Sequence, residues 1–406
     1  MVYLQRLQKS DLFDGLNIGH LKFYGLWNGI NDYRSTRKTS CIFKFNMTVS
    51  ALYVFPFVVF QFICIFIISV DLKMATFVYM NGVSAAQVLF KIIVFWYRFK
   101  DQCDLVDLLR VDFLSSIPDS KTRHVNEIYK KNSLRCNIFT ILAFTGNVLT
   151  IITWTILPGF NTEKTGTGRK KILSGWYPVT YSESPWYEIV FVYEVILICW
   201  HGSLVSLYES FLLMLLVGLY SHFVVLGYHL STLKKNDKAV VKAGVDTKID
   251  EAFNIELKKI MQDYNKLLRY STLLRTTYNA ITTVTLGLDI GVLILTIMFL
   301  MFGSSDGLST FKMMMYFSFA LIEITLLCVT SSIVGSASMS IHDSAYSSDW
   351  YVADKKFATT AQMIMIRSMI PVSLTALKMY PVNMETMIGI IRFIYSAVAI
   401  VSKMKE

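Results

Sequence analysis

Four acidic residues stand inside long apolar stretches of this sequence: Glu194, Glu209, Asp289 and Glu323. At membrane depth an ionisable side chain is costly and normally faces protein or water. Each residue is therefore either a buried polar contact or a functional group, although Glu209 is expected near the inner end of its stretch, where water would solvate it. Such carboxyl groups serve proton-coupled transport, yet the inverted internal repeat of many transporters is not visible. A small-molecule membrane transporter stays open as an alternative.

Signatures of catalysis and of metal binding are missing. The sequence has no His-Glu-x-x-His, no Gly-x-Ser-x-Gly and no phosphate-binding glycine loop, and its six histidines do not cluster. Its six cysteines include no closely spaced pair of the kind found in zinc sites. We therefore predict that the chain is not an enzyme and uses neither a metal nor a cofactor.

The composition indicates a membrane protein. Of the 406 residues, 54% are hydrophobic and only 17% are charged, and the mean hydropathy is +0.47. This is too little charge to surround a soluble core of that size. The formal charge of +10 comes from residues that lie between apolar stretches rather than on one basic face, so it indicates membrane topology and not nucleic-acid binding.

The apolar stretches predict an all-α membrane protein with seven transmembrane helices. They cover residues 47–70, 75–97, 136–157, 187–220, 281–302, 313–336 and 382–402. Most Lys and Arg residues outside these stretches lie before the first span and in every second connection after it. Because positive residues accumulate on the cytoplasmic side, the N-terminus is predicted inside and the C-terminus outside. The fourth stretch exceeds the ~20 residues that span a bilayer, so it should project beyond the membrane.

The predicted organisation has four segments. Residues 1–46 form a cytoplasmic N-terminal segment with an amphipathic helix. Residues 47–336 hold transmembrane helices one to six, with a ligand pocket in the outer half and cytoplasmic helices around 216–275. Residues 337–381 contain a cytoplasmic helix of an anchor region, and residues 382–406 form the seventh helix with a short extracellular tail.

Two polar segments carry apolar residues at helical spacing. They lie within residues 234–275 and over residues 357–380. Because an amphipathic helix must bury its apolar stripe, each needs a partner surface. We expect both helices to join the projecting fourth span in a cytoplasmic assembly region.

Several residues near the end of the chain carry a family resemblance. They are Tyr346, Trp350-Tyr351, Arg367-Ser368, Pro371, Leu374-Thr375-Ala376, Glu385 and Tyr395-Ser396. With them the chain resembles insect odorant receptors. Similarity to the common co-receptor of that family is weaker, because residues 221–275 lack its long cytoplasmic insertion. A gustatory receptor channel of the same superfamily is the near alternative, although the ending "IYSAVAIVSKMKE" differs from its typical pattern.

The resemblance implies a function and partners. It implies an odorant-binding subunit of an odour-gated, non-selective cation channel, which assembles with co-receptor subunits as a heterotetramer. The expected location is the plasma membrane of olfactory sensory neurons, where the chain contacts lipid. The expected ligand is a small volatile apolar odorant such as an ester or terpenoid.

Candidate ligand-binding residues lie in the outer halves of the second, third, fourth and sixth spans. They are Phe77, Tyr79, Met80, Val83, Asn147, Thr150, Ile151, Trp154, Phe191, Glu194, Val195, Ile198, Met315, Tyr316 and Phe319. The four in the third span recur at i, i+3, i+4 and i+7, so they share one helix face. Aromatic and Met side chains with a few hydroxyl or amide groups suit a small apolar ligand. For each residue alone, ordinary core packing is the alternative.

The seventh span is the candidate pore helix. It carries Arg392 and Ser396 among aliphatic residues, so lipid cannot surround it on all sides. The resemblance implies that this helix lines an ion pathway closed by an aliphatic constriction. Aligning Tyr395-Ser396 with the family's terminal motif places the gate at Val398, with Ile394, Tyr395 and Ser402 beside it. Ordinary helix packing of Val398 is the alternative.

Overall fold

The computed structural model describes residues 16–67, 72–111, 122–155, 172–173, 177, 184–233, 246–302, 307–351 and 355–405. Residues 1–15 and most of the predicted outer loop between the third and fourth spans lie outside these ranges. The described elements are α2 (Leu16–Phe23), α3 (Leu26–Thr36), α4 (Cys41–Ile67), α5 (Leu72–Tyr97), α6 (Phe99–Val111), α7 (Thr122–Thr155), α9 (Trp186–Ser231), α11 (Asp246–Phe302), α12 (Gly307–Tyr346), α13 (Lys355–Ser368), β1 (Thr375–Ala376), β2 (Tyr380–Pro381) and α14 (Met384–Lys405).

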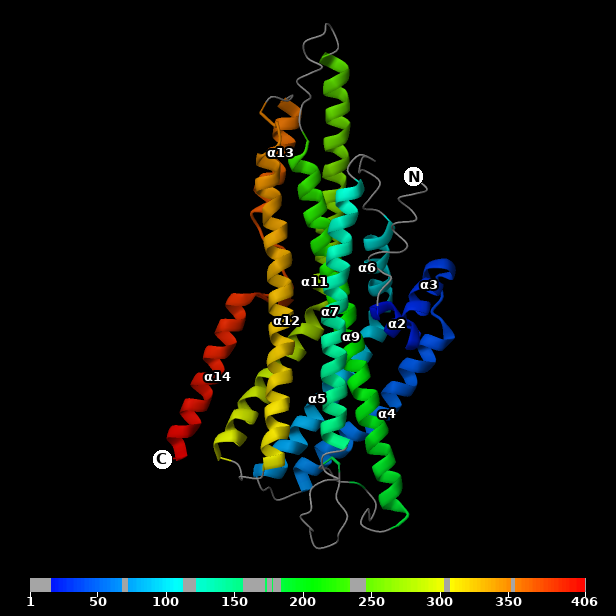
Figure 1. Ribbon diagram of the computed structural model, residues 1–406, viewed down its shortest axis with the longest axis vertical. Coiled ribbons are helices and arrows are strands. Elements are labelled where there is room, and N and C mark those ends of the chain that lie inside the picture. The colour runs from blue at the N-terminus through cyan, green and yellow to red at the C-terminus, as the bar shows by residue number, and fades with distance from the viewer. Residues whose placement is uncertain are drawn as a thin grey trace.

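Seven of the described helices are long and apolar enough to cross a membrane: α4, α5, α7, α9, α11, α12 and α14. Each predicted span overlaps one of them, and the predicted all-α fold with seven spans is confirmed. The ends at which α7 stops and α9 and α12 begin lie together at the bottom of Figure 1. The charge pattern predicts this end outside the cell, and we refer to it as the outer end.

Helix α9 forms the centre of the bundle and packs against α7 and α12 (Figure 1). In its apolar part 78% of the residues are buried, the largest share among the seven helices. A helix that is apolar all round belongs in such a buried position. Small residues let its neighbours approach closely, since a Cβ at Gly218 would stand 3.1 Å from the side chain of Leu109 on α6.

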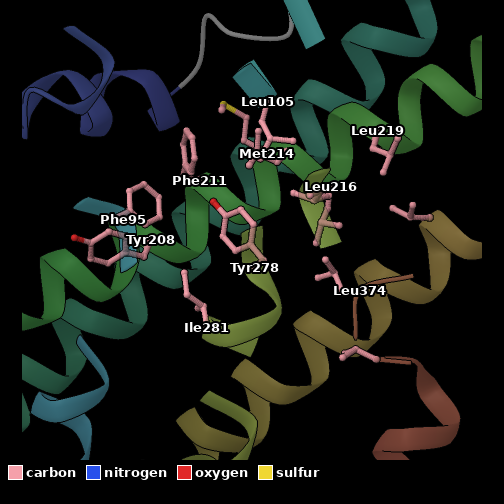
Figure 2. Packing of buried hydrophobic residues seen from close by; sticks show 14 of the residues in the cluster. Phe95, Leu105, Tyr208, Phe211, Met214, Leu216, Leu219, Tyr278, Ile281 and Leu374 are labelled. Carbon is pink, nitrogen blue, oxygen red and sulfur yellow. The ribbon is translucent and has the colours of Figure 1, made fainter. Parts of the chain in front are cut away.

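A dense core lies where α5, α6, α9 and α11 meet (Figure 2). The rings of Phe95 and Tyr208 stand 4.7 Å apart. The hydroxyl of Tyr278 donates a hydrogen bond of 3.0 Å to Oε1 of Gln102, so its polar end is satisfied inside this core. Such packing fixes the helices whose outer parts enclose the candidate site.

Helices α9, α11 and α12 are longer than a bilayer requires and extend toward the end opposite the outer one. Helices α9, α11 and α12 have 46, 57 and 40 residues, well above the ~20 that cross the hydrocarbon layer. The predicted fifth span and the predicted cytoplasmic helix before it form the single helix α11. Helix α13 packs against α12 in this region, at the top of Figure 1.

The helix predicted over residues 357–380 is wrong beyond Ser368, where α13 ends. Pro371 follows shortly and has no N–H to continue a helix. The chain instead forms the antiparallel hairpin β1–β2, in which Ala376 faces Tyr380. The backbone N–H of Lys378 in its turn donates a 2.8 Å hydrogen bond to Oδ1 of Asn279, which holds the hairpin against α11.

Helix α14 stands apart from the rest of the bundle at its outer part, as Figure 1 shows in red. It contacts α11 and α12. Ile394 and Val398 are buried on its inward face, whereas Phe393 and Tyr395 are exposed. One stripe of this helix therefore packs on the chain itself and the other faces away.

Candidate ligand-binding cavity

A cavity of about 530 Å³ lies between α5, α7, α9, α11 and α12. Phe57 of α4 and Leu173 of the outer loop complete its wall. The volume falls within the range of roughly 300–1,000 Å³ that is usual for small-molecule sites. The cavity has two chemically different parts, an aromatic chamber and a polar floor.

The aromatic chamber is formed by Trp154, Met315, Tyr316 and Phe319. The rings of Trp154 and Tyr316 meet edge to face, with centroids 5.5 Å apart. Nζ of Lys312 lies 4.3 Å from the centroid of the Trp154 ring, so a cation covers one face of the indole. These contacts hold the rings in one arrangement and leave apolar surface toward the cavity.

Gly146 sets how far Phe319 reaches into the space between α7 and α12. A Cβ at Gly146 would stand only 2.8 Å from Cε1 of Phe319, which is closer than real Cβ contacts come. Both residues line the cavity. The glycine is therefore required for the present position of this ring.

An amide on α5 offers a hydrogen bond to the chamber. The hydroxyl of Tyr316 donates to Oδ1 of Asn81 over 2.7 Å. Nδ2 of Asn81 is buried and has no hydrogen-bond partner, and the side chain lines the cavity. A buried N–H normally has an acceptor, so this amide is suited to an ester, ketone or ether oxygen of a ligand.

The polar floor consists of Gln87, Lys91, Glu209, Asp289 and Glu323, all on the cavity wall. Nζ of Lys91 donates to Oε1 of Glu323 over 3.0 Å and lies 3.7 Å from Oε1 of Glu209. Nε2 of Gln87 donates to Oδ1 of Asp289 over 3.3 Å. The floor thus joins α5, α9, α11 and α12 through charged groups.

The expectation that water simply solvates Glu209 at the inner end of its helix is wrong. Its carboxyl group faces the cavity beside Lys91. The partner that makes this possible is a lysine 118 positions earlier in the sequence, brought close by the packing of α5 on α9.

The fifteen predicted binding residues fall into two groups. Nine line the cavity: Met80, Asn147, Thr150, Ile151, Trp154, Ile198, Met315, Tyr316 and Phe319. The other six do not: Phe77, Tyr79, Val83, Phe191, Glu194 and Val195. Whether any of the nine binds a ligand stays a prediction.

Helix rotation explains several of the six. One broad face of α5 makes the cavity wall, with Met80, Asn81, Ser84, Ala85, Gln87, Val88 and Lys91. Tyr79 and Val83 are four residues apart and lie on a different face of that helix. Phe77 stands behind the wall, with its ring edge to face against Trp154 at 6.2 Å.

Glu194 binds residues of the outer loop rather than lining the cavity. Its Oε2 accepts hydrogen bonds of 3.3 Å from the backbone N–H groups of Ile172 and Leu173, and its Oε1 accepts one of 2.6 Å from the hydroxyl of Tyr177. Burial, and then the nearby Glu194 carboxylate, raise the pKa of Tyr177 above its ordinary value. Because Leu173 lines the cavity, Glu194 positions a piece of the outer loop over it.

Sequence reasoning missed Asn81, Ser84, Gln87, Lys91 and His201, which also line the cavity. One signal was available for Lys91, since a lysine within an apolar span calls for an acidic partner. The small polar residues gave no comparable signal, because serine and amide side chains are common at helix contacts in membranes.

The predicted gate residues lie on α14. Ile394 and Val398 are 6% and 9% exposed and pack toward their own chain, whereas Tyr395 is 77% exposed. Ser402 is half-buried. The gate at Val398 stays a prediction, because a constriction between subunits requires the side chain to face the axis of an assembly.

Comparisons with known proteins agree with this architecture. Residues 75–395 match the family model described as 7tm Odorant receptor. A search of curated protein sequences found no match. The fold is similar to the insect olfactory receptor OR5 from Machilis hrabei, with a TM-score of 0.76, 16% identity and 89% of each chain covered. The same receptor in complex with eugenol has a TM-score of 0.76 and 17% identity, covering 89% of this chain and 90% of that one.

Proposed function

Because this chain belongs to the 7tm odorant receptor family, we propose that it is the odorant-binding subunit of an odour-gated, non-selective cation channel. Its membership identifies it as a receptor rather than an enzyme, and its seven spanning helices make it a multi-pass membrane protein. The observation that carries the proposal is the cavity of about 530 Å³ lined by five of the spanning helices.

The ligand is a small volatile with an apolar body, such as an ester or terpenoid. The aromatic chamber suits an apolar body, and the unpaired Nδ2 of Asn81 can donate a hydrogen bond to one acceptor oxygen of the ligand. OR5 from Machilis hrabei has been solved with eugenol, a small volatile that likewise combines an apolar body with oxygen atoms. The side chains expected to contact the ligand are Trp154, Tyr316 and Phe319.

Assembly with co-receptor subunits as a heterotetramer completes the proposed channel. Its support is a set of exposed apolar side chains on α13, in the segment after it and in the hairpin turn, where Met363, Ile366, Ile370 and Met379 are 57%, 68%, 62% and 78% exposed. Contiguous exposed apolar side chains mark protein interfaces. In the proposed assembly they are covered in the cytoplasm, and the C-terminus lies outside, in the plasma membrane of olfactory sensory neurons.

Gating would couple the cavity to α14. The odorant favours the open state by binding it more tightly, and it shifts the equilibrium only by that difference in affinity. Helix α12 lines the cavity and also packs against α14. A displacement of α12 by the ligand would therefore reach the proposed gate at Val398 through one helix contact.

The test is a voltage-clamp recording from cells that express this chain with and without an insect co-receptor, under a panel of volatile esters, terpenoids, alcohols and aldehydes. We expect an odour-evoked cation current only with the co-receptor. Phe319→Ala should change the concentration dependence, whereas Phe311→Ala, on the exposed side of α12, should not. Silence to volatiles despite surface expression would contradict the proposal, with tastant-evoked current favouring a gustatory channel and saturable uptake favouring a transporter.

A further inference from the structure

The polar floor holds more negative than positive groups. Among the described residues it brings together three carboxyl groups, those of Glu209, Asp289 and Glu323, and the single ammonium group of Lys91. Lys91 is 4% exposed and Asp289 is also 4% exposed, so little water reaches either group. Lys91 is within ion-pair distance of the two glutamates. Among the described residues no cation lies within ion-pair distance of Asp289, although the charge of Lys91 acts on it from further away.

Two carboxyl oxygens of the floor lack a hydrogen bond. Oδ1 of Asp289 accepts from Gln87, but Oδ2 of Asp289 is buried and has no hydrogen-bond partner. Oε1 of Glu209 lies 3.7 Å from Nζ of Lys91, which is too long for a hydrogen bond, so it also accepts none. Both residues line the cavity. Buried carboxyl oxygens are normally hydrogen-bonded, so these atoms are suited to donors on a bound molecule.

The chemistry of the missing partner follows from these groups. A carbonyl or ether oxygen cannot satisfy another acceptor, and an anion would add to the negative charge. Among the described residues no group of His, Cys, Asp and Glu could hold a metal ion. A hydroxyl could donate one hydrogen bond, while an ammonium group donates up to three and also offsets the charge.

We propose that the polar floor is a subsite for the ammonium group of a small protonated amine, which donates hydrogen bonds to Asp289 and Glu209. The apolar body of the amine lies in the aromatic chamber. Phe319 stands four residues before Glu323 on α12, which is about one helical turn or 6 Å along the axis. A ring joined to an ammonium group by a short chain fits this separation. The inference rests on the proposed function, because it takes the cavity to be the ligand site.

The experiment compares 2-phenylethylamine with 2-phenylethanol, which has a similar shape and no charge, on cells that express this chain with the co-receptor. We expect the amine to act at concentrations about tenfold lower, as a charged hydrogen bond exceeds a neutral one by about 1.4 kcal/mol. Asp289→Asn keeps the acceptor for Gln87 and removes the charge. It should reduce sensitivity to the amine about tenfold and sensitivity to the alcohol by a clearly smaller factor, because the alcohol carries no charge and donates only one hydrogen bond.

Glu256→Gln is the matched control. It removes one carboxylate from the same helix, 33 residues from Asp289 in the sequence and therefore about 50 Å away along α11. Glu256 does not line the cavity, so the amine response of this variant should equal that of the wild type at equal surface expression.

The outcomes separate the inference from the proposed function. If neutral volatiles evoke currents but the amine is no better than the alcohol, or Asp289→Asn affects both equally, the inference is overturned and the proposed function stands. If no volatile evokes current, the proposed function fails. Binding of 2-phenylethylamine to the purified full chain in lipid nanodiscs then decides the inference: binding that Asp289→Asn abolishes supports it, and absence of binding overturns it.

Discussion

Replacing Lys91 by Met should destabilise the whole bundle, because it removes the cation from the polar floor. The ammonium group of Lys91 lies 3.0 Å from Glu323 and 3.7 Å from Glu209. With an effective dielectric constant of about 20, these separations correspond to attractions of about 5.5 and 4.5 kcal/mol before desolvation is subtracted. The change leaves two glutamates facing each other without a counter-charge.

The net effect is smaller than these attractions. The glutamate side chains are 21% and 24% exposed toward the cavity, so water and proton uptake reduce the cost. Removing one partner of a buried ion pair typically costs about 3–5 kcal/mol, and the partial exposure favours the lower end. We therefore expect a loss of about 3 kcal/mol in the free energy of unfolding.

Thermal unfolding of the purified full chain in detergent measures this loss as a lower midpoint. The stability effects of substitutions within one charge network are not additive. The double variant Lys91→Met with Glu323→Gln should therefore recover about half of the stability that Lys91→Met alone loses. Lys100→Met on the exposed surface is the control and should change stability by no more than about 0.5 kcal/mol. A single variant as stable as the wild type, or a double variant that loses the sum of both changes, would refute the reasoning.

Three further expectations follow from single contacts. Gly146→Ala should push the Phe319 ring into the cavity, because the new Cβ stands 2.8 Å from it. Sensitivity, read from concentration-response curves, should fall most for the bulkiest ligands. An unchanged preference for ligand size would contradict this. Glu194→Gln should loosen the loop at Leu173, since hydrogen bonds to a charged group contribute about 1.5–3 kcal/mol. The expected result is faster hydrogen exchange of the backbone N–H at Leu173. Unchanged exchange would show that Glu194 does not hold the loop. Ile366→Asp should reduce co-assembly with the co-receptor without lowering expression, since it charges a 68% exposed apolar position; undiminished co-purification would show that α13 is not the interface.

The spanning helices could be predicted from the sequence because an apolar run of sufficient length has one physical solution in lipid. The second span, predicted over residues 75–97, corresponds to α5 from Leu72 to Tyr97. The junction between the fifth span and the helix before it could not be predicted. A polar helix that leaves the membrane without a break carries no stop signal, and α11 continues through that point.

The candidate site was predictable where a helix has polar and apolar faces. Asn147, Thr150, Ile151 and Trp154 share a face by spacing, and all four line the cavity. On α5 the spacing gave no such guide, because most of its faces are apolar and its rotation depends on packing against α4 and α11. The pair of Lys91 with Glu323 was also out of reach, since it joins positions 232 apart in the sequence.

The contacts between α5 and α12 suggest why one change in the floor should affect both stability and gating. Tyr316 of α12 is hydrogen-bonded to Asn81 of α5. Glu323, seven residues or about two turns further along α12, is hydrogen-bonded to Lys91 of α5. A ligand that competes for either contact moves α12 relative to α5, and α14 packs on α12. Lys91→Met releases one of these two contacts without any ligand. If α12 carries the coupling, this variant should therefore alter the current in the absence of odorant, whereas an unchanged resting current in a destabilised variant would show that the floor supports only the fold.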